Sequence, residues 1–115
     1  MKIVESKFAD CTVLFHIGQN AKENDRLVEI SDPSDLWFHA KHHPSCHVIA
    51  LISDKNLQRK ELQRVIHHGS LLCKQNTKRL SSTAKVEIMY TQIKNVERTK
   101  IAGTVLTKEW KEKTV

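Results

Sequence analysis

The stretch that decides the fold of this chain reads Asp35-Leu36-Trp37-Phe38-His39-Ala40-Lys41-His42-His43-Pro44-Ser45-Cys46-His47-Val48. Apolar and aromatic residues occupy its two ends, while histidines, a lysine and a proline fill its centre. This pattern is typical of a β-hairpin. It predicts strands over residues 36–40 and 46–52, joined by a loop over residues 41–45.

The length of that loop predicts which side chains meet across the hairpin. With five loop residues, Trp37 lies opposite Ile49 and His39 lies opposite His47, so that all four share one face of the sheet. A tryptophan beside two imidazoles would form a platform on which a nucleobase can stack. The alternative is that Trp37 belongs to the core, with its indole N–H satisfied, and that both histidines bond to the backbone.

The remaining periodicities predict an α+β fold, in which a mainly antiparallel sheet built from hairpins carries one long basic-faced helix. The expected elements are a strand over 11–17, a short helix over 21–30, the hairpin, a helix from Ser53 to about Lys74, a strand over 86–90 continued by Ile93 and Val96, and a last strand over 103–106. Residues 1–107 are expected to form a single domain. Residues 108–115 are expected to form a charged tail that frays, with Trp110 as its one anchor.

The long helix is expected to be basic on its outer side. Its apolar stripe, which would pack on the sheet, comprises Leu62, Val65, Ile66, Gly69, Leu72 and Cys73. The opposite side holds Lys60, Arg64, His67 and Lys74. Gly69 stands on the buried stripe, where a glycine lets the helix lie close on the sheet.

The net charge of +6 is distributed unevenly along the chain. Residues 1–54 hold five Lys/Arg against eight Asp/Glu, whereas residues 55–115 hold fourteen against five. Clustered cations attract polyanions through Coulomb attraction and counterion release, so this asymmetry predicts contact with nucleic acid or the ribosome, and no membrane. The alternative is a solvated basic surface that maintains solubility. The candidate phosphate contacts are Lys60, Arg64, Lys74, Lys78, Arg79 and Lys85.

A chain of 115 residues with 39% hydrophobic content has room for one core. Its three cysteines, Cys11, Cys46 and Cys73, form no Cys-x-x-Cys pair, which favours reduced thiols in the cytoplasm. The N-terminus becomes charged too early for a signal peptide, and no apolar run approaches the roughly 20 residues that span a bilayer. We therefore expect a soluble cytoplasmic protein.

The histidine-rich loop raises the alternative of a metal site. His39, His42, His43, Cys46 and His47 offer ligands that suit zinc, but their spacing matches no common zinc motif. Cys46 and His47 are neighbours in a strand and point to opposite faces, so they do not form a nucleophile–base pair. No glycine-rich phosphate loop is present. We expect no enzymatic activity, no cofactor and no metal.

Four short motifs, taken together and in order, resemble one known family. They are Ile17-Gly18, Asn24-Asp25-Arg26-Leu27, Asp35-Leu36-Trp37-Phe38-His39-Ala40 and His47-Val48, and they are followed by Val86-Glu87-Ile88-Met89-Tyr90-Thr91 and Gly103-Thr104-Val105. Over residues 8–106 the chain is similar to the NFACT-R domain. That domain occurs in the ribosome-quality-control proteins related to nuclear export mediator factor and RqcH, and in shorter coiled-coil proteins.

The resemblance implies a module that binds nucleic acid, chiefly RNA, and has no catalytic activity. The larger relatives engage tRNA and the large ribosomal subunit. Ser45-Cys46 replaces the Gly-Ser pair usual in the family, which predicts a changed turn because serine adopts positive φ less readily than glycine. The sequence lacks the N-terminal domain and the coiled coil of the relatives, so their tail synthesis is not carried over. The motif positions present are Asn24, Asp25, Asp35, Trp37, His39 and His47.

Our leading hypothesis is a standalone module that binds tRNA or rRNA. The hairpin face would contact bases and the basic residues would contact phosphates, while Asn24 and Asp25 fix the loop beside the hairpin and Asp35 caps the turn into the strand. DNA is an open alternative to RNA. Two further hypotheses are an adaptor that docks on a ribosome-associated protein through the same hairpin and, less favoured, a metal-dependent hydrolase of nucleic acid with histidine ligands.

Overall fold

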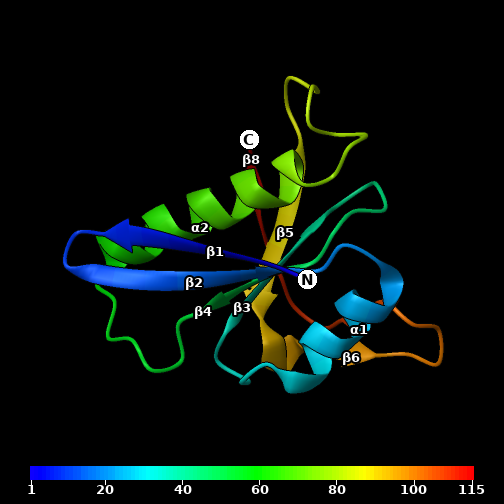
Figure 1. Ribbon diagram of the computed structural model, residues 1–115, viewed down its shortest axis with the longest axis horizontal. Coiled ribbons are helices and arrows are strands. Elements are labelled where there is room, and N and C mark those ends of the chain that lie inside the picture. Colours follow the sequence, from blue (N-terminus) through cyan, green and yellow to red (C-terminus); the bar gives the residue numbers. More distant parts are fainter.

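A six-stranded antiparallel sheet forms the centre of the computed structural model, which describes residues 1–115 (Figure 1). Its strands lie in the order β1-β2-β4-β3-β5-β8. Two helices and a separate two-stranded ribbon, β6–β7, complete an α+β fold. The elements are β1 (Lys2–Phe8), β2 (Cys11–Ile17), α1 (Ala21–Ile30), β3 (Leu36–Ala40), β4 (Val48–Leu51), α2 (Arg59–Gln75), β5 (Glu87–Gln92), the 3-10 helix η1 (Ile93–Asn95), β6 (Val96–Arg98), β7 (Val105–Thr107) and β8 (Lys111–Thr114).

The hairpin of β3 and β4 occupies the middle of the sheet. Trp37 lies opposite Ile49, which is the register that the five-residue loop predicts. Side chains alternate between the two faces of a strand, and both faces of β3 are buried. Phe38 joins the core on the α2 side, whereas Trp37 joins a second apolar cluster on the α1 side.

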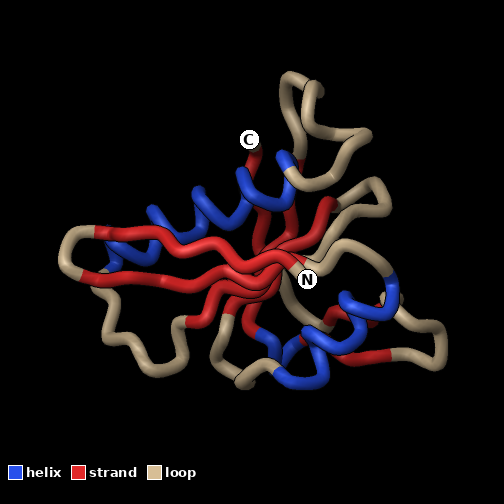
Figure 2. Tube along the Cα trace, viewed as in Figure 1, coloured by secondary structure: helices blue, strands red, loops and turns tan.

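The helix α2 runs along one face of the sheet (Figure 2). Val65, Ile66, Leu72 and Cys73 are buried in the core that lies between the helix and the sheet. Gly69 is required at this contact, since a Cβ atom there would lie 2.4 Å from Cζ of Phe38. The close approach fixes the outer side of α2 as the side that faces solvent.

The start of α2 differs from the prediction, since the helix begins at Arg59 and not near Ser53. The N–H of Ser53 donates to the carboxylate of Asp35 (3.0 Å), which holds that residue in the loop that follows β4. The helix begins instead where the N–H of Gln58 donates to the carboxylate of Glu61 (3.2 Å), as in one half of a capping box.

The opposite face of the sheet is covered by α1 and the β6–β7 ribbon (Figure 1). Leu27 and Val28 of α1 pack with Trp37 and Ile49 of the hairpin and with Ile93. The ribbon is tied to α1 by Arg98, whose guanidinium bonds to Asp25 (2.6 Å) and Glu29 (2.8 Å). The central hairpin is therefore sandwiched between two layers.

The expectation that residues 108–115 fray is wrong. Lys111–Thr114 form the edge strand β8, which pairs with β5. Val86 and Val115 exchange two main-chain hydrogen bonds (2.8 and 2.9 Å), and Lys41 pairs with Glu112 (2.7 Å). Charged side chains are common on edge strands, where they oppose aggregation, and here they conceal the apolar alternation that a strand usually shows.

Three further expectations about strands need correction. The prediction omitted β1, which pairs along its whole length with β2. Ile93 does not continue β5 but starts η1, because its N–H donates to the carbonyl of Asp35 (2.9 Å). The strand expected over residues 103–106 is β7, and it pairs with β6 outside the main sheet. Neither helix has the length and hydropathy that would let it cross a membrane.

Candidate nucleic-acid interface

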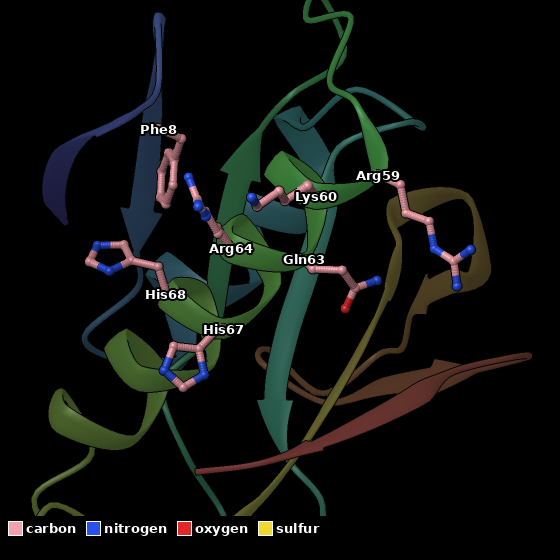
Figure 3. Close-up of a pocket in the computed structure, with 7 residues that line it drawn as sticks. All are labelled: Phe8, Arg59, Lys60, Gln63, Arg64, His67 and His68. Atoms are coloured by element: carbon pink, nitrogen blue, oxygen red, sulfur yellow. The ribbon is translucent and has the colours of Figure 1, made fainter.

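The outer side of α2 carries three cations within six residues. Arg59, Lys60 and Arg64 are exposed. Helical periodicity places Lys60 and Arg64 on the side opposite the buried stripe and places Arg59, in the first turn, at its edge. Together with Phe8 they line an open hollow of about 780 Å³ (Figure 3). We call this surface the α2 face, and it comprises Phe8, Arg59, Lys60, Gln63, Arg64, His67 and His68.

The cations of the α2 face have no acidic partner. The ion pairs of the structure involve the N-terminal amine and the side chains of Arg26, Lys41 and Arg98 as cations. The one carboxylate in the first turn, that of Glu61, accepts from the N–H of Gln58. Unpaired cations on one surface attract phosphate groups.

One wall of the α2 face is backed by a largely buried aromatic cluster, in which Phe8 is 8% exposed. Phe8 lies at the end of β1, and its ring meets the ring of His68 edge-on at 5.7 Å (Figure 3). The same histidine contacts Phe15 at 5.1 Å and bonds to Ser6 Oγ (2.8 Å). Burial and the neighbouring His67 lower the pKa of His68. His68 therefore joins the β1–β2 hairpin to α2 and places the Phe8 ring beside the cations.

The predicted basic residues fall into two clusters. Lys60 and Arg64 belong to the α2 face, while Lys78, Arg79 and Lys85 are exposed in the loop that follows the other end of the helix (Figure 2). Along the axis of α2, at 1.5 Å per residue, Lys60 and Arg64 lie about 20 Å from the end of the helix at Gln75, where the second cluster begins. Lys74 belongs to neither cluster, since its amine donates to the main-chain oxygen of Val115 (3.2 Å).

The predicted base platform on the hairpin is not accessible. Trp37 and His47 are each 1% exposed, because α1 and the β6–β7 ribbon cover that face. The indole N–H of Trp37 donates to Nδ1 of His47 (3.1 Å), and the ring of His39 stacks on the indole at 5.6 Å. Only His39 is partly exposed. The alternative interpretation, that Trp37 belongs to the core, is the one the structure bears out.

The buried imidazoles are held neutral. Burial lowers the pKa of His47 from its ordinary value of 6.5 to about 3, with a further contribution from the neighbouring His39. Burial also lowers the pKa of His39, whose Nδ1–H donates to the carbonyl of Ala40 (2.6 Å). No group of three or more His, Cys, Asp or Glu side chains in the structure could hold a metal ion.

We expect acid to destabilise the protein through His47. Between pH 6.5 and about pH 3 the unfolded chain binds a proton at this imidazole and the folded chain does not, so the free energy of unfolding falls as the pH falls through that window. Urea unfolding at pH 7.5, 5.5 and 4.5 measures the effect. His47→Asn keeps an acceptor near the Trp37 N–H without a titrating group, and its stability should fall less steeply with acid. Equal slopes for both proteins would contradict the assignment.

The remaining motif residues have structural partners, Asn24 in the hairpin segment and Asp25 in the β6–β7 ribbon. Asn24 Oδ1 accepts from the N–H of His47 (3.2 Å). The same oxygen lies close to Gly18, since a Cβ atom added to this glycine would be 2.1 Å from it. Asp25 pairs with Arg98. Asp35 is 4% exposed, and its two carboxylate oxygens accept three main-chain N–H groups.

The Ser45-Cys46 turn needs no positive φ. Only Ala9 and Gly103 have positive φ in this structure. Ser45 Oγ accepts from the N–H of Ala40 (2.9 Å) and donates to the carbonyl of Cys46 (2.9 Å), so the serine side chain itself closes the loop. All three cysteines are free thiols.

A family model described as the NFACT protein RNA binding domain matches residues 4–109. The chain belongs to this family. A curated relative, the coiled-coil domain-containing protein 25 homolog of Dictyostelium discoideum, is 28% identical over 93 residues, which is 81% of this chain. The chain spans 45% of the length of that relative.

The fold of this NFACT RNA-binding domain also occurs in a solved structure. The C-terminal part of the fibronectin/fibrinogen-binding protein from Streptococcus suis superimposes with a TM-score of 0.79 at 22% sequence identity. The match covers 100% of this chain and 45% of that one. At this identity the likeness shows a shared fold.

The sequence prediction missed part of the candidate interface of this NFACT RNA-binding domain. Arg59 and Gln63 are four residues apart, adjacent to Lys60 and Arg64, and this spacing could have revealed them. Phe8 could not be found in this way, because it belongs to β1, which the prediction did not include.

Proposed function

We propose that this domain binds RNA through the α2 face, and that its RNA is a tRNA or an rRNA engaged in ribosome-associated quality control. The observation that carries the proposal is the set of three unpaired cations on the exposed side of α2 in an NFACT RNA-binding domain. Lys60 and Arg64 bind phosphates, while Phe8, which is 8% exposed, belongs to the core beneath the hollow.

The second basic cluster favours a structured RNA. An RNA that contacts the α2 face and the loop of Lys78 and Arg79 together must present phosphates about 20 Å apart. The folded backbones of tRNA and rRNA present phosphates over such distances. The large ribosomal subunit, which is rich in exposed rRNA, is therefore the partner that we propose in the cytoplasm.

The burial and the neutral state of His47 are consistent with a binding role without catalysis. His47 is buried, neutral and bonded to Trp37, so it is neither exposed to a substrate nor free to exchange protons near pH 7. The adaptor hypothesis relies on the same hairpin, of which only residues 41–44 form a fully exposed segment. The α2 face offers RNA more contact groups than that loop offers a protein partner.

We expect RNA binding to weaken steeply as salt increases. Fluorescence anisotropy with a labelled tRNA and with a four-residue single-stranded RNA measures affinity between 50 and 300 mM KCl. Each phosphate contact contributes a slope of roughly −0.7 to −0.9 in a plot of log affinity against log salt concentration. We expect a slope of about −2 for the four-residue RNA, which is long enough to reach only the three cations of the α2 face, and a steeper slope for tRNA. An undetectable affinity at 50 mM KCl would refute the proposal.

A further inference from the structure

A second hollow adjoins the α2 face. It has a volume of about 380 Å³ and lies between α2, β5 and the segment that leads into β8. Gln63 lines both hollows, so the two form one continuous surface across the helix. In Figure 3 the side chains of Arg59 and Gln63 extend to the side of α2 that is away from Phe8 and His68. The second hollow therefore lies beside the cations, opposite the aromatic wall.

The floor of this hollow is apolar and its rim is aromatic. Leu36 and Ile66 are 7% and 4% exposed and form part of the floor. Tyr90 is half-buried, and burial raises the pKa of its phenol. Trp110 stands at the rim with 45% of its surface exposed, and its indole N–H bonds to the carboxylate of Glu112 (3.4 Å). An exposed tryptophan over an apolar floor is suited to a flat apolar group.

Free hydrogen-bonding groups surround the same floor. The side-chain amides of Gln63 and Gln92 make no hydrogen bond within the protein, and each offers both a donor and an acceptor. The amide N–H of Asn95 donates to Thr91 Oγ1 (2.9 Å), which orients the side chain and leaves its carbonyl oxygen open. These groups complement the edge of a nucleobase, which also carries donors and acceptors in one plane.

We infer that this hollow, which we call the Trp110 pocket, takes a single unpaired nucleobase of the RNA. The inference rests on the proposed function. The base stacks on the Trp110 indole and inserts towards Leu36 and Ile66, and its edge meets the free amides. The backbone of the same nucleotide lies against Lys111 on one side and Arg59 on the other.

The charge and the size of the pocket favour a nucleotide over an apolar peptide side chain. The charged side chains that line the pocket are Lys111 and Glu109, and Arg59 lines the adjoining hollow, so a phosphate next to the inserted base would have two cations against one carboxylate within reach. The volume lies near the lower end of the range for ligand pockets, roughly 300–1,000 Å³, which suits one base. A base held in a duplex has no face available for stacking, so the pocket selects single-stranded positions.

The test compares RNA with a chain of the same charge that lacks bases. We would measure, by fluorescence anisotropy at 100 mM KCl, binding of a six-residue oligoadenylate and of an abasic ribose-phosphate chain of the same length. Trp110→Leu should weaken binding of the oligoadenylate by roughly 5- to 150-fold, the range expected from loss of one base–aromatic stack. It should leave binding of the abasic chain unchanged, because phosphate contacts do not involve the indole. Trp110→Phe retains an aromatic face and should keep most of the affinity.

The outcomes separate this inference from the proposed function. Leu106→Ala removes another exposed apolar side chain, 62% exposed on β7, and should change neither affinity. If Trp110→Leu weakened binding of the oligoadenylate and of the abasic chain equally, or weakened neither, the inference that the Trp110 pocket binds a base would be overturned. In both cases the affinity of the wild-type protein for RNA would still support the proposal that the α2 face binds RNA. Failure of wild type to bind either chain or tRNA would overturn both ideas. Thermal unfolding of Trp110→Phe and Trp110→Leu checks that the variants fold.

Discussion

Replacement of Arg59, Lys60 and Arg64 together by glutamate is expected to reduce RNA affinity at least 100-fold at 100 mM KCl. Three attractive phosphate contacts become repulsive, and each exposed contact contributes on the order of 1 kcal/mol, so that the sum is about 3 kcal/mol. None of these side chains makes an ion pair or a hydrogen bond in the structure, so the melting temperature should change little. Anisotropy with tRNA measures the affinity.

The control for this variant carries the same change in net charge elsewhere. Lys22 on α1, Lys94 in η1 and Lys100 in the β6–β7 loop are exposed and form no ion pair. Their replacement by glutamate should reduce affinity less than 5-fold, because charges beyond a Debye length of about 10 Å from the RNA are largely screened. Equal losses in the two triple variants would mean that net charge, and not the α2 face, determines binding.

The second basic cluster can be tested against the same RNAs. Reversal of Lys78, Arg79 and Lys85 should weaken tRNA binding and leave a four-residue RNA unaffected, since the short RNA spans only about 14 Å and reaches one cluster at a time. This comparison distinguishes a bipartite interface from two independent basic surfaces.

The outer side of α2 could be predicted because helical periodicity is a local property. The same is true of β2, where Val13, Phe15 and Ile17 alternate with less buried residues, and the predicted boundaries of β2 and α1 agree with the structure. Edge strands are different. β1 and β8 are rich in charged residues. β1 is stabilised by pairing with β2, and β8 by pairing with β5, and this pairing cannot be predicted from the strand's own sequence.

The role of Trp37 could not be predicted because its burial depends on another layer. Residue type and hairpin register correctly place Trp37 and His47 together, but they say nothing about what covers that face. The cover consists of α1 and the β6–β7 ribbon, and the ribbon lies about 60 residues later in the chain. A family motif of aromatic and histidine residues therefore serves here as an internal support.

Asp35→Ala is expected to be the most destabilising single change, with a loss of about 3–5 kcal/mol in the free energy of unfolding. Asp35 Oδ1 accepts from the N–H groups of Ile52 and Ser53 (3.0 Å each), and Oδ2 accepts from the N–H of Asp32 (3.1 Å). Hydrogen bonds to a charged group contribute roughly 1.5–3 kcal/mol each, and they are not fully additive. Alanine leaves all three N–H groups without that acceptor in a site where the carboxylate was 4% exposed.

Asp35→Asn keeps the shape of the Asp35 side chain but removes one of its two hydrogen-bond acceptors, so it separates the two contributions. The amide retains one oxygen for Ile52 and Ser53 but turns an N–H₂ group towards the N–H of Asp32, so we expect a loss of about 1–2 kcal/mol. Urea unfolding at pH 7 ranks the three proteins. Below its unfolding transition, Asp35→Asn should bind tRNA with wild-type affinity, because the side chain lies under the loop that precedes α2 and its oxygens are already occupied. A large loss of RNA affinity in a folded Asp35→Asn variant would instead make this motif residue part of the interface.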